Sequence, residues 1–340
     1  MANDYATAVR NGSMQAARLH AHLGTRDAMQ QTGGGVDVFG ATFVVDLPLL
    51  LRPLDGLLGA YLPSPMPGVL ITTERPLSIQ RFTAAHELGH FWLKHEPSLD
   101  DEEGMLRRMA NVPLRNIPTP EFQETEADAF AVGFLMPRWL IEWHCARQNW
   151  RTSNLVEPHV VYQLSLRLGA SYEATTWTLQ RYKFISGSTG RVLRATKPRD
   201  LKVSLLGDYK PQNYRGDVWV LTRYDAGTRI DGSRNDHFIL RLNEHSGGGY
   251  LWNIEELKQS GFAVVKDGRD SPDDESIGGP VFRNVTAAPS EPQRGELRLQ
   301  ERRPWQSTEP LTEFALNFDF TGPEEAGLSR SEQRMLLEAA

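Results

Sequence analysis

The segment His86-Glu87-Leu88-Gly89-His90 constrains this chain of 340 residues more than any other feature. It lies within residues 78–95, a stretch without proline that is predicted to form a helix. Residues four apart share one face of a helix, so the imidazoles of His86 and His90 can converge on a single metal ion. Glu87 projects beside them, where it can accept a proton from a coordinated water. This is the H-E-x-x-H arrangement of zinc hydrolases, and it predicts a Zn²⁺ site.

A catalytic zinc site usually has three protein ligands, and the acidic segment at residues 124–131 is expected to supply the third. Glu124 and Asp128 share one face of a second helix, predicted for residues 120–142. One carboxylate could bind the metal while the other accepts a hydrogen bond from a ligating imidazole. Glu126 lies on a different face and is the rival ligand. The alternative is that the acidic face is simply solvated.

Together these two segments resemble the ImmA/IrrE family of zinc metallopeptidases, over roughly residues 30–190. The family pattern is R-F-x-x-A-H-E-x-x-H, followed by E-x-x-A-N/D-x-F-A-x-x-x-L-M-P. The matching residues are Arg81, Phe82, Ala85, His86, Glu87 and His90, then Glu124, Ala127, Asp128, Phe130, Ala131, Leu135, Met136 and Pro137. The resemblance implies that His86, His90 and Glu124 bind zinc and that Glu87 is the general base. The E-x-x-x-D spacing of related peptidases favours Glu124 over Glu126.

The resemblance also implies hydrolysis of a peptide bond by an endopeptidase. Zinc lowers the pKa of bound water from 15.7 towards ~7, and Glu87 would accept the proton released. A donor to the oxyanion is expected, and His95, Arg81, Tyr61 and His144 all remain candidates. The family's usual substrates are helix-turn-helix transcriptional repressors in stress, phage or mobile-element responses, and such a repressor is the expected protein partner.

The rest of the first 150 residues is predicted from local signals. A helix is expected at residues 3–22, and strands at 39–48 and 68–76, where β-branched residues lie between glycine and proline. Between these strands, five prolines favour loop and short strand. The acidic residues 98–105 are expected to form a surface loop. Pro137 is expected to interrupt the second long helix.

Residues 155–185 are predicted to form two short helices joined by a glycine-containing turn, with Ser171 as N-cap of the second. The unit resembles the helix-turn-helix-like segment that follows the peptidase core in the same family. Residues 151–205 hold 9 basic and 3 acidic residues, a net charge of +6, between segments of −5 and −7. DNA contact through Arg167, Arg181 or Lys183 is conceivable, but packing on the peptidase domain is favoured.

The remaining residues, from about 207, alternate short β-rich runs with Gly, Asn and Asp, which predicts an all-β sandwich. Three segments in this region resemble loops of the chagasin-type inhibitors of papain-like cysteine peptidases, which have an immunoglobulin-like fold. They are GYLW at 249–252, IGGPVF at 277–282 and RRPWQ at 302–306. The N-P-T-T residues expected before GYLW are replaced by residues 244–249. The fold is therefore expected without inhibitory activity, and Trp252 and Trp305 could simply be core residues.

The sequence thus predicts an α+β protein, with a zincin-like domain at residues 1–150, a helical segment at 151–205, a chagasin-like sandwich at 206–322 and a helical tail at 323–340. A flexible loop is expected at 267–276. A single cysteine, Cys145, excludes an internal disulfide and fits a reducing cytoplasm. Neither a signal peptide nor a membrane span is expected. The alternatives to the zinc endopeptidase are a recognition module acting through the sandwich and a DNA-binding regulator.

Overall fold

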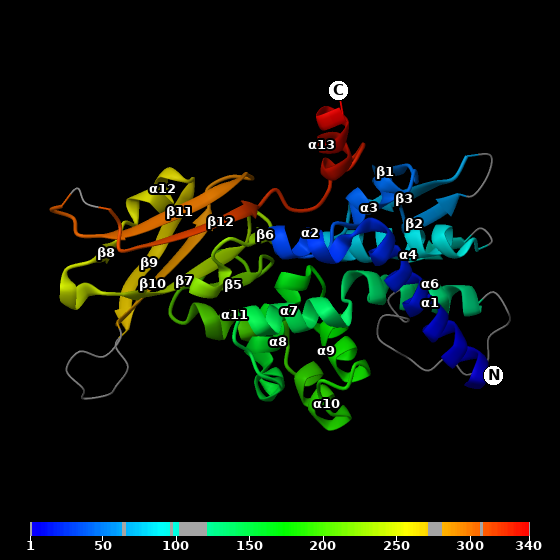
Figure 1. Ribbon diagram of the computed structural model, residues 1–340, viewed down its shortest axis with the longest axis horizontal. Coiled ribbons are helices and arrows are strands. Elements are labelled where there is room, and N and C mark those ends of the chain that lie inside the picture. The colour runs from blue at the N-terminus through cyan, green and yellow to red at the C-terminus, as the bar shows by residue number, and fades with distance from the viewer. Residues whose placement is uncertain are drawn as a thin grey trace.

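The computed structural model describes residues 2–62, 66–95, 98–101, 121–270, 281–306 and 309–339. Figure 1 shows three parts: an α/β part at the right, a group of helices at the lower centre and a β-sandwich at the left. The α/β part consists of α1 (Ala2–Leu23), α2 (Thr25–Thr32), α3 (Val38–Val44), β1 (Leu49–Arg52), β2 (Leu57–Leu62), β3 (Gly68–Thr72), α4 (Leu77–Leu93), β4 (Ser98–Asp101) and α6 (Glu121–Leu135).

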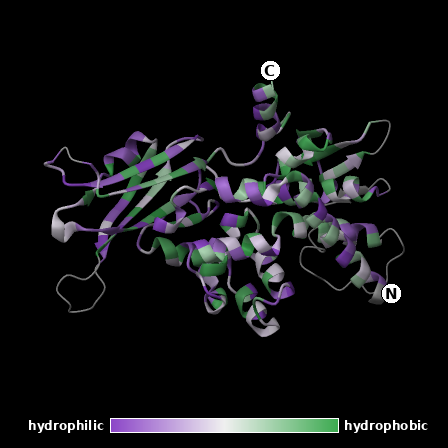
Figure 2. Cartoon of the chain, in the orientation of Figure 1, coloured by the Kyte–Doolittle hydropathy of each residue, from purple (hydrophilic) through white to green (hydrophobic). Residues whose placement is uncertain are grey.

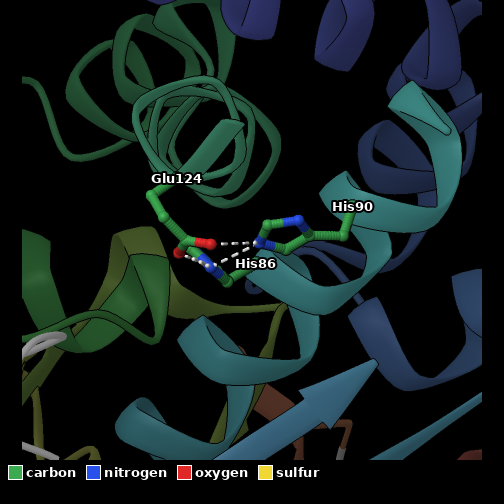
Figure 3. A group of neighbouring side chains, drawn as sticks. All are labelled: His86, His90 and Glu124. Carbon is green, nitrogen blue, oxygen red and sulfur yellow. Dashed lines mark hydrogen bonds and ion pairs between the residues drawn. The ribbon is translucent and has the colours of Figure 1, made fainter. Parts of the chain in front are cut away.

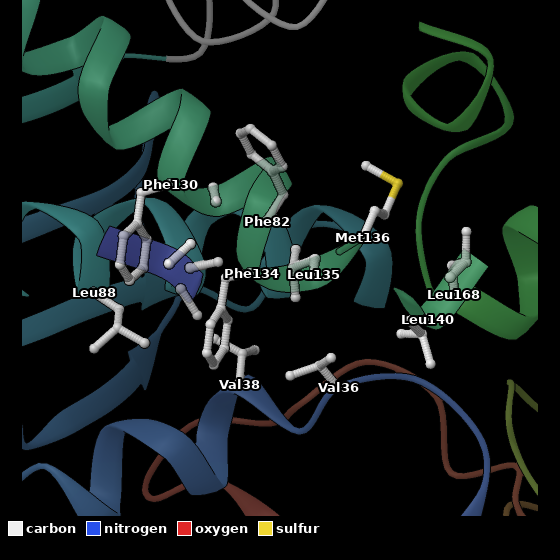
Figure 4. Close-up of a cluster of buried hydrophobic side chains, with 14 of the residues drawn as sticks. Val36, Val38, Phe82, Leu88, Phe130, Phe134, Leu135, Met136, Leu140 and Leu168 are labelled. Atoms are coloured by element: carbon white, nitrogen blue, oxygen red, sulfur yellow. The ribbon is translucent and has the colours of Figure 1, made fainter. Parts of the chain in front are cut away.

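The strands of the α/β part form one mixed sheet in the order β1-β3-β2-β4. β1 runs parallel to β3, whereas β2 is antiparallel to both β3 and β4. α4 packs on β2 and β3 and also contacts α6. The core of this part, drawn in Figure 4, includes Leu88 of α4 and the stacked rings of Phe130 and Phe134 of α6, all fully buried. This packing fixes which faces of α4 and α6 meet, and therefore which side chains lie between them.

Small residues let α1 lie close against α6. A Cβ added at Gly12 would overlap the backbone carbonyl oxygen of Glu126, and one added at Gly133 would lie 3.2 Å from the Cβ of Ala16. Further along, the Nε2 atom of His20 lies 3.0 Å from the backbone oxygen of Phe134. α1 therefore supports α6 along much of its length.

The connecting helices are α7 (Arg138–Arg147), α8 (Pro158–Leu168), α9 (Tyr172–Arg181), α10 (Gly187–Ala195) and α11 (Pro198–Leu206), with a 3-10 turn at Thr152–Val156. α8 ends at Gly169, whose φ of 64° lies in the left-handed region. The hydroxyl of Ser171 then accepts a hydrogen bond from the backbone of Ala174, so the predicted N-cap is confirmed. Within α9 only Glu173 and Arg181 are exposed, because its other faces pack inside the molecule.

The C-terminal part is a sandwich of two four-stranded sheets, ordered β5-β7-β10-β9 and β6-β12-β11-β8. Its core contains a cluster of phenylalanine rings, Phe238, Phe262, Phe318 and Phe320, with centroids 4.8–6.1 Å apart. Hydrophobic and hydrophilic residues alternate along its strands (Figure 2). The elements are β5 (Val218–Thr222), β6 (Arg229–Asp231), β7 (His237–Glu244), β8 (Leu251–Trp252), α12 (Glu255–Gln259), β9 (Phe262–Asp270), β10 (Val281–Pro289), β11 (Arg294–Arg302) and β12 (Thr312–Asp319), with 3-10 turns at Arg223–Asp225 and Ser246–Gly248.

The free edge of β5 is covered by polar side chains of α8. The hydroxyl of Tyr162 accepts a hydrogen bond from the backbone of Val218, and Gln163 donates to the oxygen of that residue and accepts from the nitrogen of Val220. Arg167 donates to the oxygen of Val220 at 2.9 Å. An open strand edge invites pairing with another chain, and these side chains satisfy the edge within the molecule instead. Residues 155–185 thus join the two larger parts, as the packing alternative in the sequence analysis expected.

After β12 the chain returns to the α/β part. The backbones of Gly327 and Leu51 exchange two hydrogen bonds, 2.8 and 2.9 Å long, at the outer edge of β1. The side chain of Gln80, on α4, accepts a hydrogen bond from the backbone nitrogen of Glu324 and donates to its oxygen. The last helix, α13 (Arg330–Ala339), then packs against α3. Residues 320–329, here called the return strap, therefore hold the sandwich to α4 and β1.

The α+β fold class is confirmed, but two local predictions were wrong. Residues 39–48 were expected to form a strand, yet Val38–Val44 form α3, because the Asp37 carboxylate accepts a hydrogen bond from Gly40 and caps the helix. The predicted loop at 98–105 begins with β4, which pairs with β2. Its residues 102–105 lie outside the described residues, as do residues 271–276 of the predicted loop at 267–276, whose first residues belong to β9.

Candidate metal centre

Three ligand atoms converge between α4 and α6. The Nε2 atoms of His86 and His90 lie 2.9 Å apart, and carboxylate oxygens of Glu124 lie 3.2 Å from the first and 3.5 Å from the second. Figure 3 shows both rings and the carboxylate pointing toward one position. The two histidines are fully buried and Glu124 is partly exposed. The structure therefore brings together the three residues that the sequence analysis singled out as ligands.

The spacing of these atoms fits a zinc ion. Tetrahedral coordination with bonds of about 2.0–2.1 Å places neighbouring ligand atoms about 3.3–3.4 Å apart. The two ring nitrogens lie 2.9 Å apart, Oε2 of Glu124 lies 3.2 Å from that of His86 and Oε1 lies 3.5 Å from that of His90, so the separations fall on either side of that value. Two imidazole nitrogens and one carboxylate oxygen also match the donor set of catalytic zinc sites, which leave one position for water.

Hydrogen-bond partners and burial influence the protonation of the residues that form the centre. The Nδ1 atom of His86 lies 2.9 Å from the Asp128 carboxylate, so Asp128 is placed where the resemblance expected a hydrogen-bond partner of a ligand. Burial opposes ionisation of Glu124, but hydrogen bonds and ion pairs with His86 and His90 outweigh it and hold its pKa well below the usual range. Burial lowers the pKa of His90, which favours the neutral ring that a metal requires.

Glu87 lies on α4 between the two histidines, and only 1% of its surface is exposed. A Cβ added at Gly59 of β2 would lie 3.1 Å from a carboxylate oxygen of Glu87. Glycine at position 59 therefore leaves room for this carboxylate between the helix and the sheet. A buried carboxylate adjacent to the convergent ligands is suited to act as a base on a water molecule held there.

A second set of polar side chains lies behind His90. The Nδ1 atom of His95 is 3.1 Å from Nδ1 of His90, and its Nε2 atom is 3.0 Å from the Glu126 carboxylate. Glu126 also accepts a hydrogen bond of 3.1 Å from Asn11 of α1. Glu126, the rival ligand in the sequence analysis, thus contacts His95 and not the convergent atoms.

The sequence analysis missed the pairing of His95 with Glu126. The pairing arises at the end of α4, where the backbone of Lys94 has a φ of 61°. This turn reverses the chain, and the backbone of His95 donates a hydrogen bond to the oxygen of His90. The ring of His95 is thereby returned to the ring of the second metal ligand.

The other candidate oxyanion donors have contacts with groups that are not part of the centre. Arg81 donates to the backbone oxygen of Val36, and His144 lies 3.1 Å from that of Gly34. Burial lowers the pKa of His144 to about 3. The ring of Tyr61 packs edge-on against Phe91. Of the four candidates, His95 is the one whose ring lies against a ligand histidine.

The basic residues proposed for DNA contact separate into two kinds. Arg167 is buried, with 4% of its side chain exposed, and forms an ion pair of 2.8 Å with Asp225. It is therefore occupied in the contact between the connecting helices and the sandwich, as the favoured packing interpretation expected. Arg181 and Lys183 are exposed, but α9 offers little other exposed surface for reading a groove.

Two of the chagasin-like segments lie together at one end of the sandwich. A Cβ at Gly249 would touch the ring of Trp305, and the guanidinium of Arg303 lies 4.6 Å from the ring centre of Tyr250. Trp252 is buried, whereas 68% of Trp305 is exposed, so the core interpretation holds for the first tryptophan and fails for the second. Of the segment 277–282, residues 277–280 lie outside the described residues.

Within the described part of the chain, no helix combines the length and apolar character needed to cross a membrane. No curated protein sequence matches the chain. Among solved structures, the chain is similar to the crystal structure of the cysteine protease inhibitor EhICP2 from Entamoeba histolytica, with 20% identity and a TM-score of 0.28, covering 32% of this chain and 99% of that one. It is also similar to the solution structure of amebosin, with 17% identity and a TM-score of 0.23, covering 31% and 97%.

Two family models match separate regions of the chain. Residues 53–179 match the IrrE N-terminal-like domain, a metallopeptidase family, and this range contains every residue of the metal centre. Residues 232–318 match the chagasin family of peptidase inhibitors, I42, and this range contains the exposed Trp305. Both resemblances found in the sequence are confirmed. One polypeptide therefore carries a region that matches the IrrE N-terminal-like domain of a metallopeptidase family and a region that matches the chagasin family of peptidase inhibitors.

Proposed function

We propose that this protein is a zinc-dependent endopeptidase. The observation that carries the proposal is the convergence of His86, His90 and Glu124, whose ligand atoms all lie within 4.8 Å of one another. The family match to residues 53–179 supports the metallopeptidase class. Zinc bound by these residues would lower the pKa of a water molecule and polarise the scissile carbonyl.

The residues of the chain would carry the proton steps and hold the site in order. Glu87 accepts a proton from the attacking water and passes it to the nitrogen of the leaving amine. Asp128 fixes the ring of His86 through Nδ1, so that Nε2 faces the ligand position. The ionised state of Glu124 makes it a ready ligand at neutral pH, because its pKa lies far below 7.

We propose further that the substrate is a regulatory protein, and specifically a helix-turn-helix transcriptional repressor cleaved during a stress, phage or mobile-element response in the cytoplasm. The support for this step is the match to the IrrE N-terminal-like family and the sequence resemblance to ImmA/IrrE peptidases. A recognition domain attached to the peptidase is consistent with cleavage of one selected protein.

The test compares wild-type protein with Glu87→Gln against a helix-turn-helix repressor encoded beside it. We expect the wild type to produce defined fragments by mass spectrometry and the variant to lose at least about 10²-fold in rate. The variant should still bind one zinc ion per chain, because all three ligands remain. Equal cleavage by the two proteins would refute the role of Glu87, and removal of zinc without loss of cleavage would refute the metal mechanism.

A second function, protein recognition by the sandwich, is favoured by the exposure of Trp305. A large indole that is 68% exposed beside a glycine-rich turn is typical of a residue that inserts into a partner. A papain-like cysteine peptidase is the class of partner that the chagasin-family match suggests. In the full-length protein, Trp305→Ala should abolish binding to such an enzyme, whereas Glu296→Ala, near the other end of β11, should not. Absence of binding by the wild type would remove this function.

A further inference from the structure

The hydrogen-bond contacts of the His90 ring determine which of its two nitrogens carries the proton. The Nε2 atom of His90 faces Glu124 and His86, so this nitrogen is the ligand atom and cannot carry a proton when a metal is bound. The proton of the neutral ring must then lie on Nδ1, which is 3.1 Å from Nδ1 of His95. Two ring nitrogens at this distance need one donor and one acceptor. Since His90 donates, Nδ1 of His95 must accept.

The same reasoning extends outward to α1. A neutral His95 that accepts at Nδ1 carries its proton on Nε2, and this atom lies 3.0 Å from the Glu126 carboxylate. The other oxygen of Glu126 accepts a hydrogen bond of 3.1 Å from the side chain of Asn11. Each donor thus faces an acceptor in one continuous series from the ligand ring to the N-terminal helix.

We propose that His95 and Glu126 form a positioning relay that holds His90 in its metal-binding tautomer and orientation. The proposal rests on the proposed function, since it requires a metal at the centre. Partners of ligating histidines that accept from the second ring nitrogen are a general feature of protein zinc sites. In this chain the acceptor for His90 is a neutral imidazole, whose own proton is fixed by a carboxylate one ring further away.

The two ligand histidines are therefore supported in different ways. His86 contacts the Asp128 carboxylate directly, and both residues belong to the pair of helices that carries the centre. His90 depends on His95, which lies beyond the end of α4, and on Asn11, which lies on α1. The buried position of His95, with 6% of its side chain exposed, excludes water as a ready substitute. The relay thus makes the packing of α1 on α6 relevant to metal affinity.

Three substitutions at one position separate positioning from packing. Asparagine can place an acceptor near the position of Nδ1, glutamine can place a donor near that of Nε2, and leucine offers neither. We expect His95→Leu to weaken zinc binding by about 10–100-fold. His95→Asn should keep affinity within about threefold of the wild type, and His95→Gln should bind at least about fivefold more weakly than His95→Asn. His22→Leu, an exposed histidine of α1 outside the relay, is the matched control and should leave affinity unchanged.

Affinity is measured on the full-length protein by competition with a chromogenic zinc chelator, and the ligand field by visible absorption after Co²⁺ substitution. Thermal unfolding of the metal-free variants reports packing separately. Wild-type zinc affinity in His95→Leu would overturn the relay, as would equal losses in His95→Asn and His95→Gln that follow the fall in Tm. If His95→Leu does not fold, the Asn and Gln pair decides the question. Failure of the wild type to bind zinc would instead refute the metal centre, and the relay with it.

Discussion

Removing Arg167 should reveal how firmly the two family domains are joined. Its guanidinium donates to the Asp225 carboxylate at 2.8 Å and to the backbone oxygen of Val220 at 2.9 Å, and the two charged side chains are 4% and 2% exposed. Asp225 also accepts hydrogen bonds from Gln148 at 2.7 Å and from the backbone of Thr222 at 2.9 Å. The substitution Arg167→Met keeps an unbranched side chain about as long as the aliphatic stem of arginine and removes the guanidinium with its charge.

The expected loss of stability follows from the groups that stay buried after the substitution. After the substitution, the Asp225 carboxylate is still buried and has lost its only charged partner among the described ion pairs, while the oxygen of Val220 has lost a donor. Breaking a buried pair from one side costs about 3–5 kcal/mol. Adding Asp225→Asn removes the stranded charge, so the double variant should recover about 1–3 kcal/mol relative to the sum of the single losses.

Urea unfolding of the full-length proteins measures these differences, with circular dichroism and the fluorescence of the tryptophans as probes. Lys258→Met is the control, because its ion pair with Glu255 is exposed and should be worth less than about 1 kcal/mol. A loss below about 1 kcal/mol for Arg167→Met, or strictly additive losses in the double variant, would contradict the reasoning. Zinc affinity should stay unchanged throughout, since none of these residues contacts the metal centre.

Three further predictions concern packing, pH and the return strap. Gly12→Ala should lower stability by about 1–3 kcal/mol, because the added methyl group overlaps a backbone carbonyl of α6. The control Gly187→Ala, whose Cβ would have room, should not lower it, and equal thermal unfolding of the two variants would count against the close packing of α1 on α6. Burial lowers the pKa of His144 to about 3, so unfolding takes up a proton and stability falls as the pH drops below about 6.5. His144→Gln should reduce the slope of stability against pH by about 1.4 kcal/mol per pH unit between pH 6 and 4, and an unchanged slope would contradict this role of His144. Gln80→Leu removes both hydrogen bonds to Glu324 and should cost about 1–3 kcal/mol; unaltered protease cleavage of residues 320–329 would show that the strap does not depend on them.

The sequence was sufficient to predict the two helices that carry the candidate ligands. It was less informative about which acidic residue is the third ligand. Two histidines four residues apart on a helix without proline lie on one face, where both can bind the same metal ion. The choice between Glu124 and Glu126 depended on the family pattern, since spacing alone fits either. In the structure that choice is made by the rotation of α6, which packing against α1 and α4 sets and which no local signal in the sequence reports.

At two places, tertiary contacts decide what local sequence signals cannot. Residues 39–48 are rich in β-branched residues, yet the cap at Asp37 and burial of residues 38–42 favour the helix. Arg167 belongs to a basic segment for which DNA contact and internal packing were both open, with packing favoured. Its partner lies 58 positions later in the sequence, so the ion pair could not be predicted without knowing that β5 lies beside α8.

The return strap makes the α/β part, which carries the candidate metal centre, discontinuous along the sequence. The sheet on which α4 packs is extended at β1 by Gly327, and Gln80 of α4 contacts Glu324, although the family match ends at residue 179. A shortened chain that ends after the connecting helices would therefore expose the edge of β1 and leave the fully buried Gln80 without its two hydrogen bonds to Glu324. Expression of that region alone should yield an aggregation-prone fragment, because the segment that pairs with the outer edge of β1 would be missing.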